Sequence, residues 1–137
     1  MQSTPNPSRP RPRILLVEDS ARVRELLAEE LTEIEGAQVV GWTDNAPEAI
    51  RRFAELQPDL VILDLALSEG SGFDVLNALR ERPRSVSIIV YSGHDADPYR
   101  QRALANGANA FVSKARIGQE LFSLVRSLTT EPSPPQN

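Results

Sequence analysis

Apolar and polar residues follow one another along the chain with two different periods. Short runs of consecutive apolar residues are typical of strands that are buried on both faces, as in parallel sheets. Such runs predict strands at residues 14–17, 38–42, 60–64, 87–91 and 110–113. Between the runs, apolar residues recur every three or four positions, which predicts helices at residues 20–34, 45–57, 73–80, 98–106 and 118–129.

Strands that alternate with helices predict an α/β fold with a doubly wound, five-stranded parallel sheet covered on both faces. Two strand orders are common in such sheets, and in both the ligand binds at the carboxyl ends of the strands, where the order reverses. The buried stripe of the first helix is expected to comprise Val23, Leu26, Leu27, Leu31 and Ile34. Trp42, which closes the second strand, is expected to pack against the fold.

Prolines are concentrated at the two ends of the chain. Seven of the eleven lie in residues 1–12 and 131–137, which predicts two flexible tails around one domain at residues 13–130. With 137 residues, the chain is long enough for a single domain with a substantial core.

Charge and composition exclude several kinds of site. The net charge of −4 gives no electrostatic argument for binding nucleic acid or an anionic membrane. No cysteine is present, which excludes disulfides and fits a cytoplasmic protein. The chain has one lysine, Lys114, and one histidine, His94, so a zinc site would have to consist almost wholly of carboxylates, which zinc does not favour. The N-terminus lacks the apolar stretch of a signal peptide, and no apolar stretch is long enough for a membrane span.

Polar residues follow the predicted strands at the edge where a ligand would bind. Glu18 and Asp19 follow the first strand, Asp64 ends the third, Ser92 follows the fourth and Lys114 follows the fifth. Asp64 lies within the most hydrophobic run of the chain, where an ionised carboxylate needs a partner or a cleft. Taken singly, each residue has a simpler explanation: the acids could cap a helix or end a strand, and a lysine is usually solvated.

Three carboxylates at one edge would repel one another unless a cation joined them. Oxygen ligands together with water suit Mg²⁺, and Lys114 would add a second positive charge. A carboxylate in such a pocket could act as a nucleophile on phosphorus and form an acyl phosphate. The residues therefore predict a magnesium-dependent phosphoryl-transfer site centred on Asp64.

Four segments resemble the receiver domain of two-component response regulators. They are I-L-L-V-E-D at 14–19, D-L-V-I-L-D-L-A-L at 59–67, I-I-V-Y-S-G at 88–93 and G-A-N-A-F-V-S-K at 107–114, with Gly72 eight residues after Asp64. The resemblance covers residues 13–128 and implies the strand order 2-1-3-4-5 of flavodoxin-like folds.

The resemblance also implies roles for the site residues. Asp64 would be the phosphoacceptor and Lys114 would contact the phosphoryl oxygens. Mg²⁺ would be held by Glu18, Asp19, Asp64 and the backbone carbonyl of Ala66.

Two further residues would form the switch. Ser92 would hydrogen-bond the phosphoryl group, and Phe111 would change rotamer as the loop after the fourth strand moves, although Phe111 could also be a core residue.

Two positions depart from the family pattern, because Ser68 and Ala115 replace prolines that are frequent there.

The partners implied are a sensor histidine kinase or a phosphotransfer protein, and a downstream protein or output domain. Nucleic acid would be bound only through a separate output domain, and a phosphorylation-dependent dimer is a further expectation. The chain would act as a cytoplasmic signalling switch and not as a turnover enzyme, either alone or as part of a longer regulator.

Two alternatives remain open from the residues. One is a phosphatase with an aspartyl nucleophile. Such enzymes have a second acid two residues after the nucleophile, but here that position is Ala66. The other is a flavin-binding module of similar fold, but the loop after the first strand is acidic where a flavin phosphate would bind.

Overall fold

The computed structural model describes residues 12–82, 86–93 and 97–129. Apart from Pro12, which is buried and accepts a hydrogen bond from Gln38 N at 3.0 Å, the predicted tails lie outside these ranges, as does His94. Five strands and five helices alternate in the described residues. The strands are β1 (Arg13–Val17), β2 (Gln38–Thr43), β3 (Leu60–Asp64), β4 (Ser87–Ser92) and β5 (Ala110–Ser113). The helices are α1 (Ala21–Thr32), α2 (Ala46–Leu56), α3 (Gly72–Arg80), α4 (Asp97–Ala105) and α5 (Ile117–Thr129).

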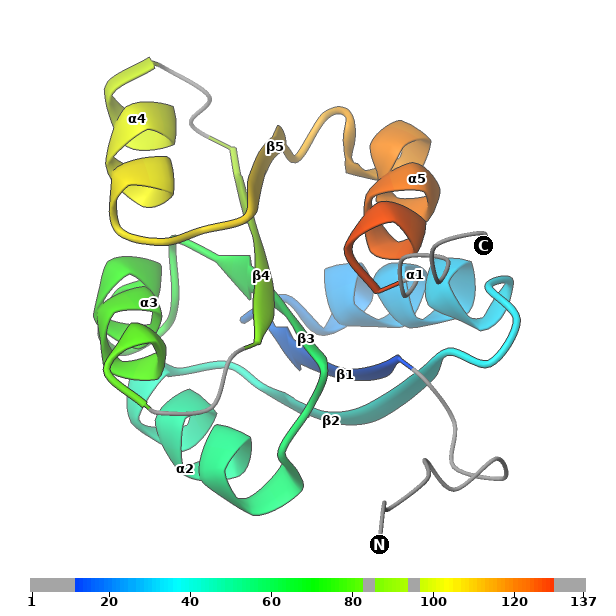
Figure 1. The fold of residues 1–137 in the computed structure, drawn as a ribbon, viewed down its shortest axis with the longest axis horizontal. Coiled ribbons are helices and arrows are strands. Elements are labelled where there is room, and N and C mark those ends of the chain that lie inside the picture. The colour runs from blue at the N-terminus through cyan, green and yellow to red at the C-terminus, as the bar shows by residue number, and fades with distance from the viewer. Residues whose placement is uncertain (1–11, 83–85, 94–96, 130–137) are drawn as a thin grey trace, which may run out of the picture.

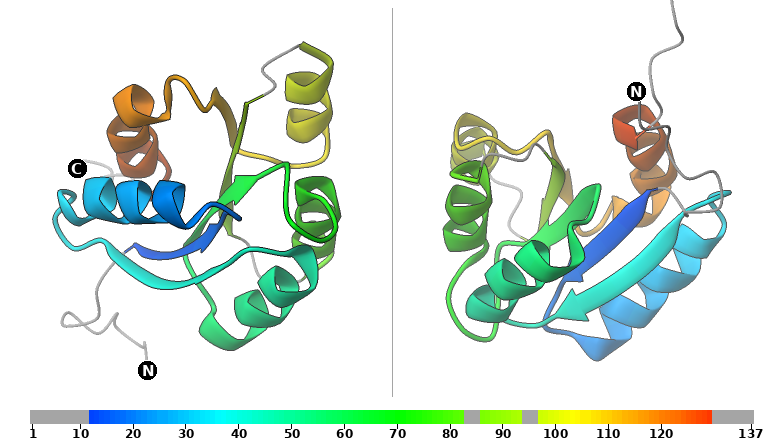
Figure 2. Two further views of the ribbon diagram at one scale, coloured as in Figure 1. Left: turned by 180° about the vertical axis from the view of Figure 1, so that it is seen from behind. Right: turned by 60° about the horizontal axis from the view of Figure 1, so that its bottom comes forward.

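All strand pairs are parallel, and the sheet has the order β2-β1-β3-β4-β5 (Figure 1). The predicted fold class and strand order are therefore confirmed. Helices α1 and α5 cover one face of the sheet, and α2, α3 and α4 cover the other (Figures 1 and 2). β3 lies at the centre of the sheet, and all five of its residues are buried, as its continuous apolar run predicts.

Side-chain caps set the beginnings of three helices. The hydroxyl of Ser20 accepts a hydrogen bond from Val23 N, and the side chain of Asn45 accepts one from Glu48 N. Ser71 and Asp74 form a complete capping box at the start of α3. Because Ser20 caps α1, Asp19 is not used as its cap and remains available to the site.

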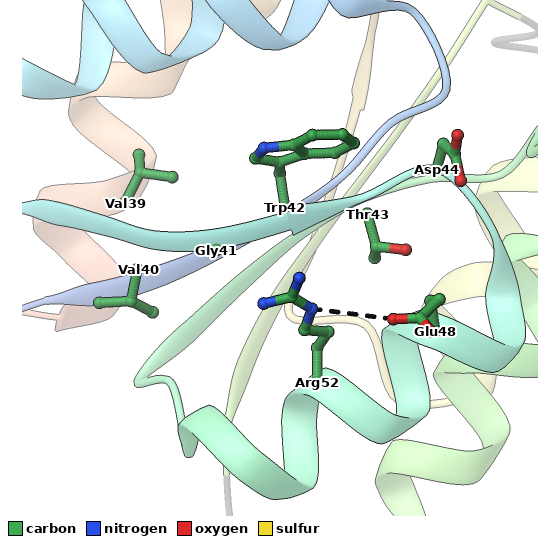
Figure 3. Close-up of a pocket in the computed structure, with 8 residues that line it drawn as sticks. All are labelled: Val39, Val40, Gly41, Trp42, Thr43, Asp44, Glu48 and Arg52. Atoms are coloured by element: carbon green, nitrogen blue, oxygen red, sulfur yellow. Dashed lines mark ion pairs between the residues drawn. The ribbon is translucent and has the colours of Figure 1, made fainter.

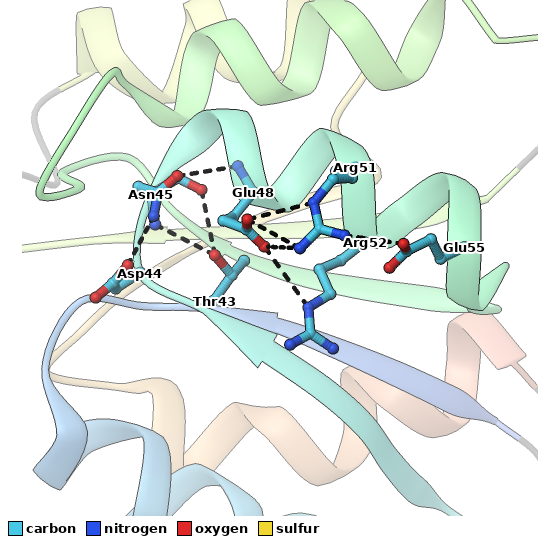
Figure 4. Close-up of polar contacts among 7 residues, drawn as sticks. All are labelled: Thr43, Asp44, Asn45, Glu48, Arg51, Arg52 and Glu55. Atoms are coloured by element: carbon cyan, nitrogen blue, oxygen red, sulfur yellow. Dashed lines mark hydrogen bonds and ion pairs between the residues drawn. The ribbon is translucent and has the colours of Figure 1, made fainter.

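The exposed side of α2 carries a chain of ion pairs beside the Asn45 cap (Figure 4). Arg51 lies between Glu48 and Glu55, at 2.7 and 2.9 Å, and Arg52 lies 3.7 Å from Glu48. Pairs of this kind on an exposed helix face contribute only tenths of a kcal/mol each, so burial of Ala49 and Phe53 anchors the helix instead.

Two expectations about packing were wrong. Leu26 is 52% exposed, and Trp42 is 50% exposed. On a helical wheel Leu26 lies about 100° from Leu27, outside the arc that faces the sheet. Trp42 lies on β2, an edge strand, where the guanidinium of Arg24 covers one face of its ring at 3.6 Å.

Candidate functional site

The parallel register brings the predicted site residues to one edge of the sheet. Val17 pairs with Leu63, Asp64 pairs with Tyr91, and Ser92 pairs with Ser113, so the residues at these strand ends are neighbours. The order of the strands reverses between β1 and β3, which is where ligands bind in folds of this kind. The edge predicted from the sequence is therefore assembled in the structure.

Lys114 links two of the acids. Its Nζ lies 2.8 Å from Asp64 Oδ2 and 3.4 Å from Glu18 Oε1. The Asp64 side chain is 1% exposed and that of Lys114 is 33% exposed. Although partial burial lowers the pKa of Lys114, the hydrogen bond and charge of Asp64 and the charge of Glu18 outweigh it, so the pKa is raised. The amine is therefore held as an ammonium next to a buried carboxylate.

The loop after β3 orients the other oxygen of Asp64. Oδ1 accepts a hydrogen bond from Ala66 N at 3.0 Å. The chain then turns back, and Gly72 N donates to Leu65 O at 2.9 Å. At Gly72 a side chain would collide with backbone atoms of Asp64 and Leu65, so only glycine allows this close approach.

Glu18 is fully buried, yet both of its carboxylate oxygens have partners. Ser20 N donates to Oε2 at 2.9 Å, and the hydroxyl of Tyr91 donates to Oε1. Tyr91 is also fully buried. Burial, followed by the bond to Glu18, raises the pKa of Tyr91, so the phenol keeps its proton and remains a donor.

Sequence reasoning did not identify Tyr91 as part of the site. A signal was available, because a tyrosine in a strand buried on both faces needs a hydrogen-bond partner for its hydroxyl. The partner could not be named from the sequence, since Glu18 lies 73 positions away.

Asp19 is the exposed member of the acidic group. Burial, together with the hydrogen bond and charge of Glu18, raises the pKa of Asp19, and Lys114 offsets part of this effect. Glu18, Asp19 and Asp64 each offer a carboxylate oxygen within 4.8 Å of one another, which is close enough to hold a metal ion. An all-oxygen set of clustered carboxylates fits a hard divalent cation such as Mg²⁺.

Ser92 and Phe111 lie on the neighbouring strands β4 and β5. Both are buried, at 2% and 5% exposed. The guanidinium carbon of Arg100 lies 5.0 Å from the centroid of the Phe111 ring, and Arg100 donates to the Phe111 carbonyl at 3.3 Å. Phe111 is thus packed in the core and contacts α4 in this structure.

The two positions that lack the family's prolines have defined environments. The hydroxyl of Ser68 donates to Asp44 O at 2.8 Å, which ties the loop after β3 to the loop after β2. Ala115 is exposed in the turn between β5 and α5, where Arg116 N donates to Ser113 O at 3.0 Å.

A hollow of about 530 Å³ lies beside β2 and α2 (Figure 3). It is lined by Val39, Val40, Gly41, Trp42, Thr43, Asp44, Glu48 and Arg52. None of the predicted site residues takes part in it. Glu48 and Arg52, which line the hollow, form an ion pair with each other. We therefore place the functional site at Glu18, Asp19 and Asp64 and not in this hollow.

Comparisons with known proteins point to one family. A family model for the response regulator receiver domain matches residues 14–126. The chain is 28% identical over 114 residues to the response regulator GacA of Pseudomonas viridiflava, covering 83% of this chain and 53% of GacA. It is 31% identical over 102 residues to the chemotaxis protein CheY of Thermotoga maritima, covering 74% of this chain and 84% of CheY.

A solved structure gives the same result. The signal receiver domain of a putative Luxo repressor protein from Vibrio parahaemolyticus superposes with a TM-score of 0.80 at 29% identity, covering 86% of this chain and 89% of that domain. The chain spans about half the length of the GacA proteins that it matches. Among the described residues, no helix is long and apolar enough to cross a membrane.

Proposed function

The chain belongs to the response regulator receiver domains of two-component signalling, and on that premise we propose that it is a switch in which Asp64 accepts a phosphoryl group. The observation that carries the proposal is the placement of a buried Asp64 within 2.8 Å of the only lysine and beside two further carboxylates. A phosphatase or a flavin-binding module is not favoured, because the comparisons identify receiver domains.

In the proposed step a carboxylate oxygen of Asp64 attacks the phosphorus of a phosphohistidine. The O–P bond forms as the P–N bond breaks, and the released imidazole takes a proton from solvent. The product is an acyl phosphate on Asp64. The ammonium of Lys114 would move from Asp64 to the phosphoryl oxygens and neutralise part of their charge.

Glu18, Asp19 and Asp64, with the backbone carbonyl of Ala66, are the residues that we propose to hold Mg²⁺. The bound ion supplies positive charge to the phosphoryl oxygens. The three carboxylates lie within 4.8 Å of one another, and this clustering supports the assignment because a cation would relieve the repulsion between them.

Ser92 and Phe111 are proposed to transmit the signal. The hydroxyl of Ser92 would donate to the phosphoryl group, and Phe111 would change rotamer with the loop. The pairing of β4 with β5 and the Arg100 contact to Phe111 support a connection to α4. The face formed by α4, β5 and α5 would then bind the next protein or a second copy.

The proposed phosphoryl donor is a sensor histidine kinase or a phosphotransfer protein, and the reader is a downstream protein or an output domain. The chain itself would catalyse only its own phosphorylation and dephosphorylation, in the cytoplasm where these partners act.

Acetyl phosphate with Mg²⁺ provides a direct test. Intact-mass spectrometry should detect one added phosphoryl group on the wild type and on Asp44→Asn, a control in the loop after β2. Asp64→Asn should gain none, and EDTA should prevent the gain in every variant. Beryllofluoride should shift the NMR signals of Ser92 and Phe111 in the wild type and in Asp44→Asn, but not in Asp64→Asn. Equal phosphorylation of Asp64→Asn would show that the assignment is wrong.

A further inference from the structure

Tyr91 contacts the acidic group from the layer of apolar residues that lies between the sheet and helices α1 and α5. Among the described residues it is the largest fully buried side chain, and it belongs to the apolar cluster that includes Leu16, Leu121 and Val125. Its hydroxyl leaves this cluster to donate to Glu18 Oε1, and its ring lies 5.4 Å from Lys114 Nζ. Tyr91 thus contacts Glu18 through its hydroxyl and Lys114 through its ring.

The partners of Glu18 limit the number of lone pairs that its carboxylate can offer to a cation. A carboxylate has about four lone-pair sites. Tyr91 and Lys114 both approach Oε1, and Ser20 N occupies one side of Oε2. Because Oε1 is approached from two directions and Asp19 also shares a hydrogen bond with Glu18, this carboxylate can offer a cation one oxygen at most and not a bidentate pair.

We propose that Tyr91 is a positioning residue for the cation site, acting through Glu18. Its hydroxyl fixes the orientation of a buried carboxylate and so keeps Glu18 in the position from which it offers an oxygen to the group it forms with Asp19 and Asp64. Partners of this kind, which hold a ligand without touching the metal, typically change metal affinity about 10- to 100-fold when they are removed. This inference rests on the proposed function, because it takes the acidic group to be a magnesium site.

The contribution of the hydroxyl can be separated from that of the ring. Tyr91→Phe keeps the buried ring, its packing and its contact with Lys114, and removes only the donor to Glu18. The other tyrosine, Tyr99, is 43% exposed on α4 and provides a matched control as Tyr99→Phe.

The experiment is a Mg²⁺ titration of the full chain by calorimetry, with thermal unfolding in EDTA as a check on folding. Tyr91→Phe should bind Mg²⁺ at least about tenfold more weakly than the wild type, and Tyr99→Phe should bind like the wild type. In a Glu18→Gln background the further change Tyr91→Phe should have no effect on affinity, because Tyr91 acts through Glu18.

A spectroscopic readout complements the affinities. Mg²⁺ should perturb the near-ultraviolet absorbance of tyrosine in the wild type and in Tyr99→Phe, but not in Tyr91→Phe. Folded Tyr91→Phe with wild-type affinity would overturn the positioning role, as would an equal loss in the Glu18→Gln background. Absence of Mg²⁺ binding by the wild type would instead remove the proposed metal site itself.

Discussion

Lys114 Nζ lies 2.8 Å from Asp64 Oδ2, although the two residues are 50 positions apart in the chain. Asp64 ends β3 and Lys114 follows β5, and these strands are not neighbours, since β4 lies between them. The contact therefore bridges over the end of β4 and depends on the whole central part of the sheet.

Replacement of Lys114 should destabilise the chain in the absence of Mg²⁺. Lys114→Met leaves Asp64 buried without its cation and three carboxylates without a counter-charge. Because Lys114 is one third exposed, the expected loss in the free energy of unfolding is only about 1–3 kcal/mol, less than for a fully buried pair. Urea denaturation in EDTA measures it, and Lys114→Arg, which keeps the charge, should lose less. An unchanged urea midpoint for Lys114→Met would show that the pair adds no stability.

Two glycines near the site should respond very differently to alanine. A Cβ at Gly72 would collide with the carbonyl of Asp64 and lie 2.6 Å from Leu65 Cα, and these backbone atoms cannot move aside easily. Gly72→Ala should lower the free energy of unfolding by about 1–3 kcal/mol and slow phosphorylation, because Asp64 is displaced. At Gly93 no atom lies within 4 Å of the added Cβ, so Gly93→Ala should change stability by less than about 0.5 kcal/mol. Similar losses in both variants would contradict this account.

Helix α4 should depend on arginine–aromatic contacts. Ala103 is its only buried residue, and the guanidinium carbon of Arg102 lies 3.9 Å from the centroid of the Phe73 ring. Arg102→Ala should remove about 0.5–1 kcal/mol of local stability and speed hydrogen exchange of the α4 amides. Gln101→Ala, at the exposed position beside it, serves as the control. Equal exchange in the two variants would exclude a role for the Arg102 contact.

Tyr91 should make the chain sensitive to alkaline pH. Its pKa is raised in the folded state, so above about pH 10 the unfolded chain loses a proton that the folded chain retains. The stability that Tyr91 contributes is therefore complete below pH 10 and decreases as the pH rises. The free energy of unfolding of the wild type should fall relative to that of Tyr91→Phe by up to about 1.4 kcal/mol per pH unit. Parallel pH profiles for the two proteins would contradict this prediction.

The sequence predicted the order of the elements and the edge at which the site forms. Leu60–Asp64 could be recognised as a strand because a short, continuous apolar run is typical of a strand buried on both faces. The ends of the parallel strands then placed Asp64 beside Glu18 and Lys114. The family resemblance supplied the strand order, which periodicity alone left open.

Other features depend on contacts that no local pattern encodes. Trp42 is apolar, but it lies on an edge strand, and Arg24 partly shields its exposed ring. Leu26 is different, because its position on the helical wheel already places it outside the buried arc of α1. The role of Tyr91 was missed for the opposite reason. Its ring fits the apolar run of β4, and only the fold reveals that its hydroxyl meets Glu18.

The single lysine offers a simple way to observe the site. Its backbone N–H donates to Ser92 O at 2.9 Å, so the amide of Lys114 joins the ends of β4 and β5. Incorporation of ¹⁵N-lysine into the chain would give one backbone amide resonance, because all other basic residues except His94 are arginines. That one signal would report on the bond between the two strands in a spectrum free of overlap, even within a much larger complex.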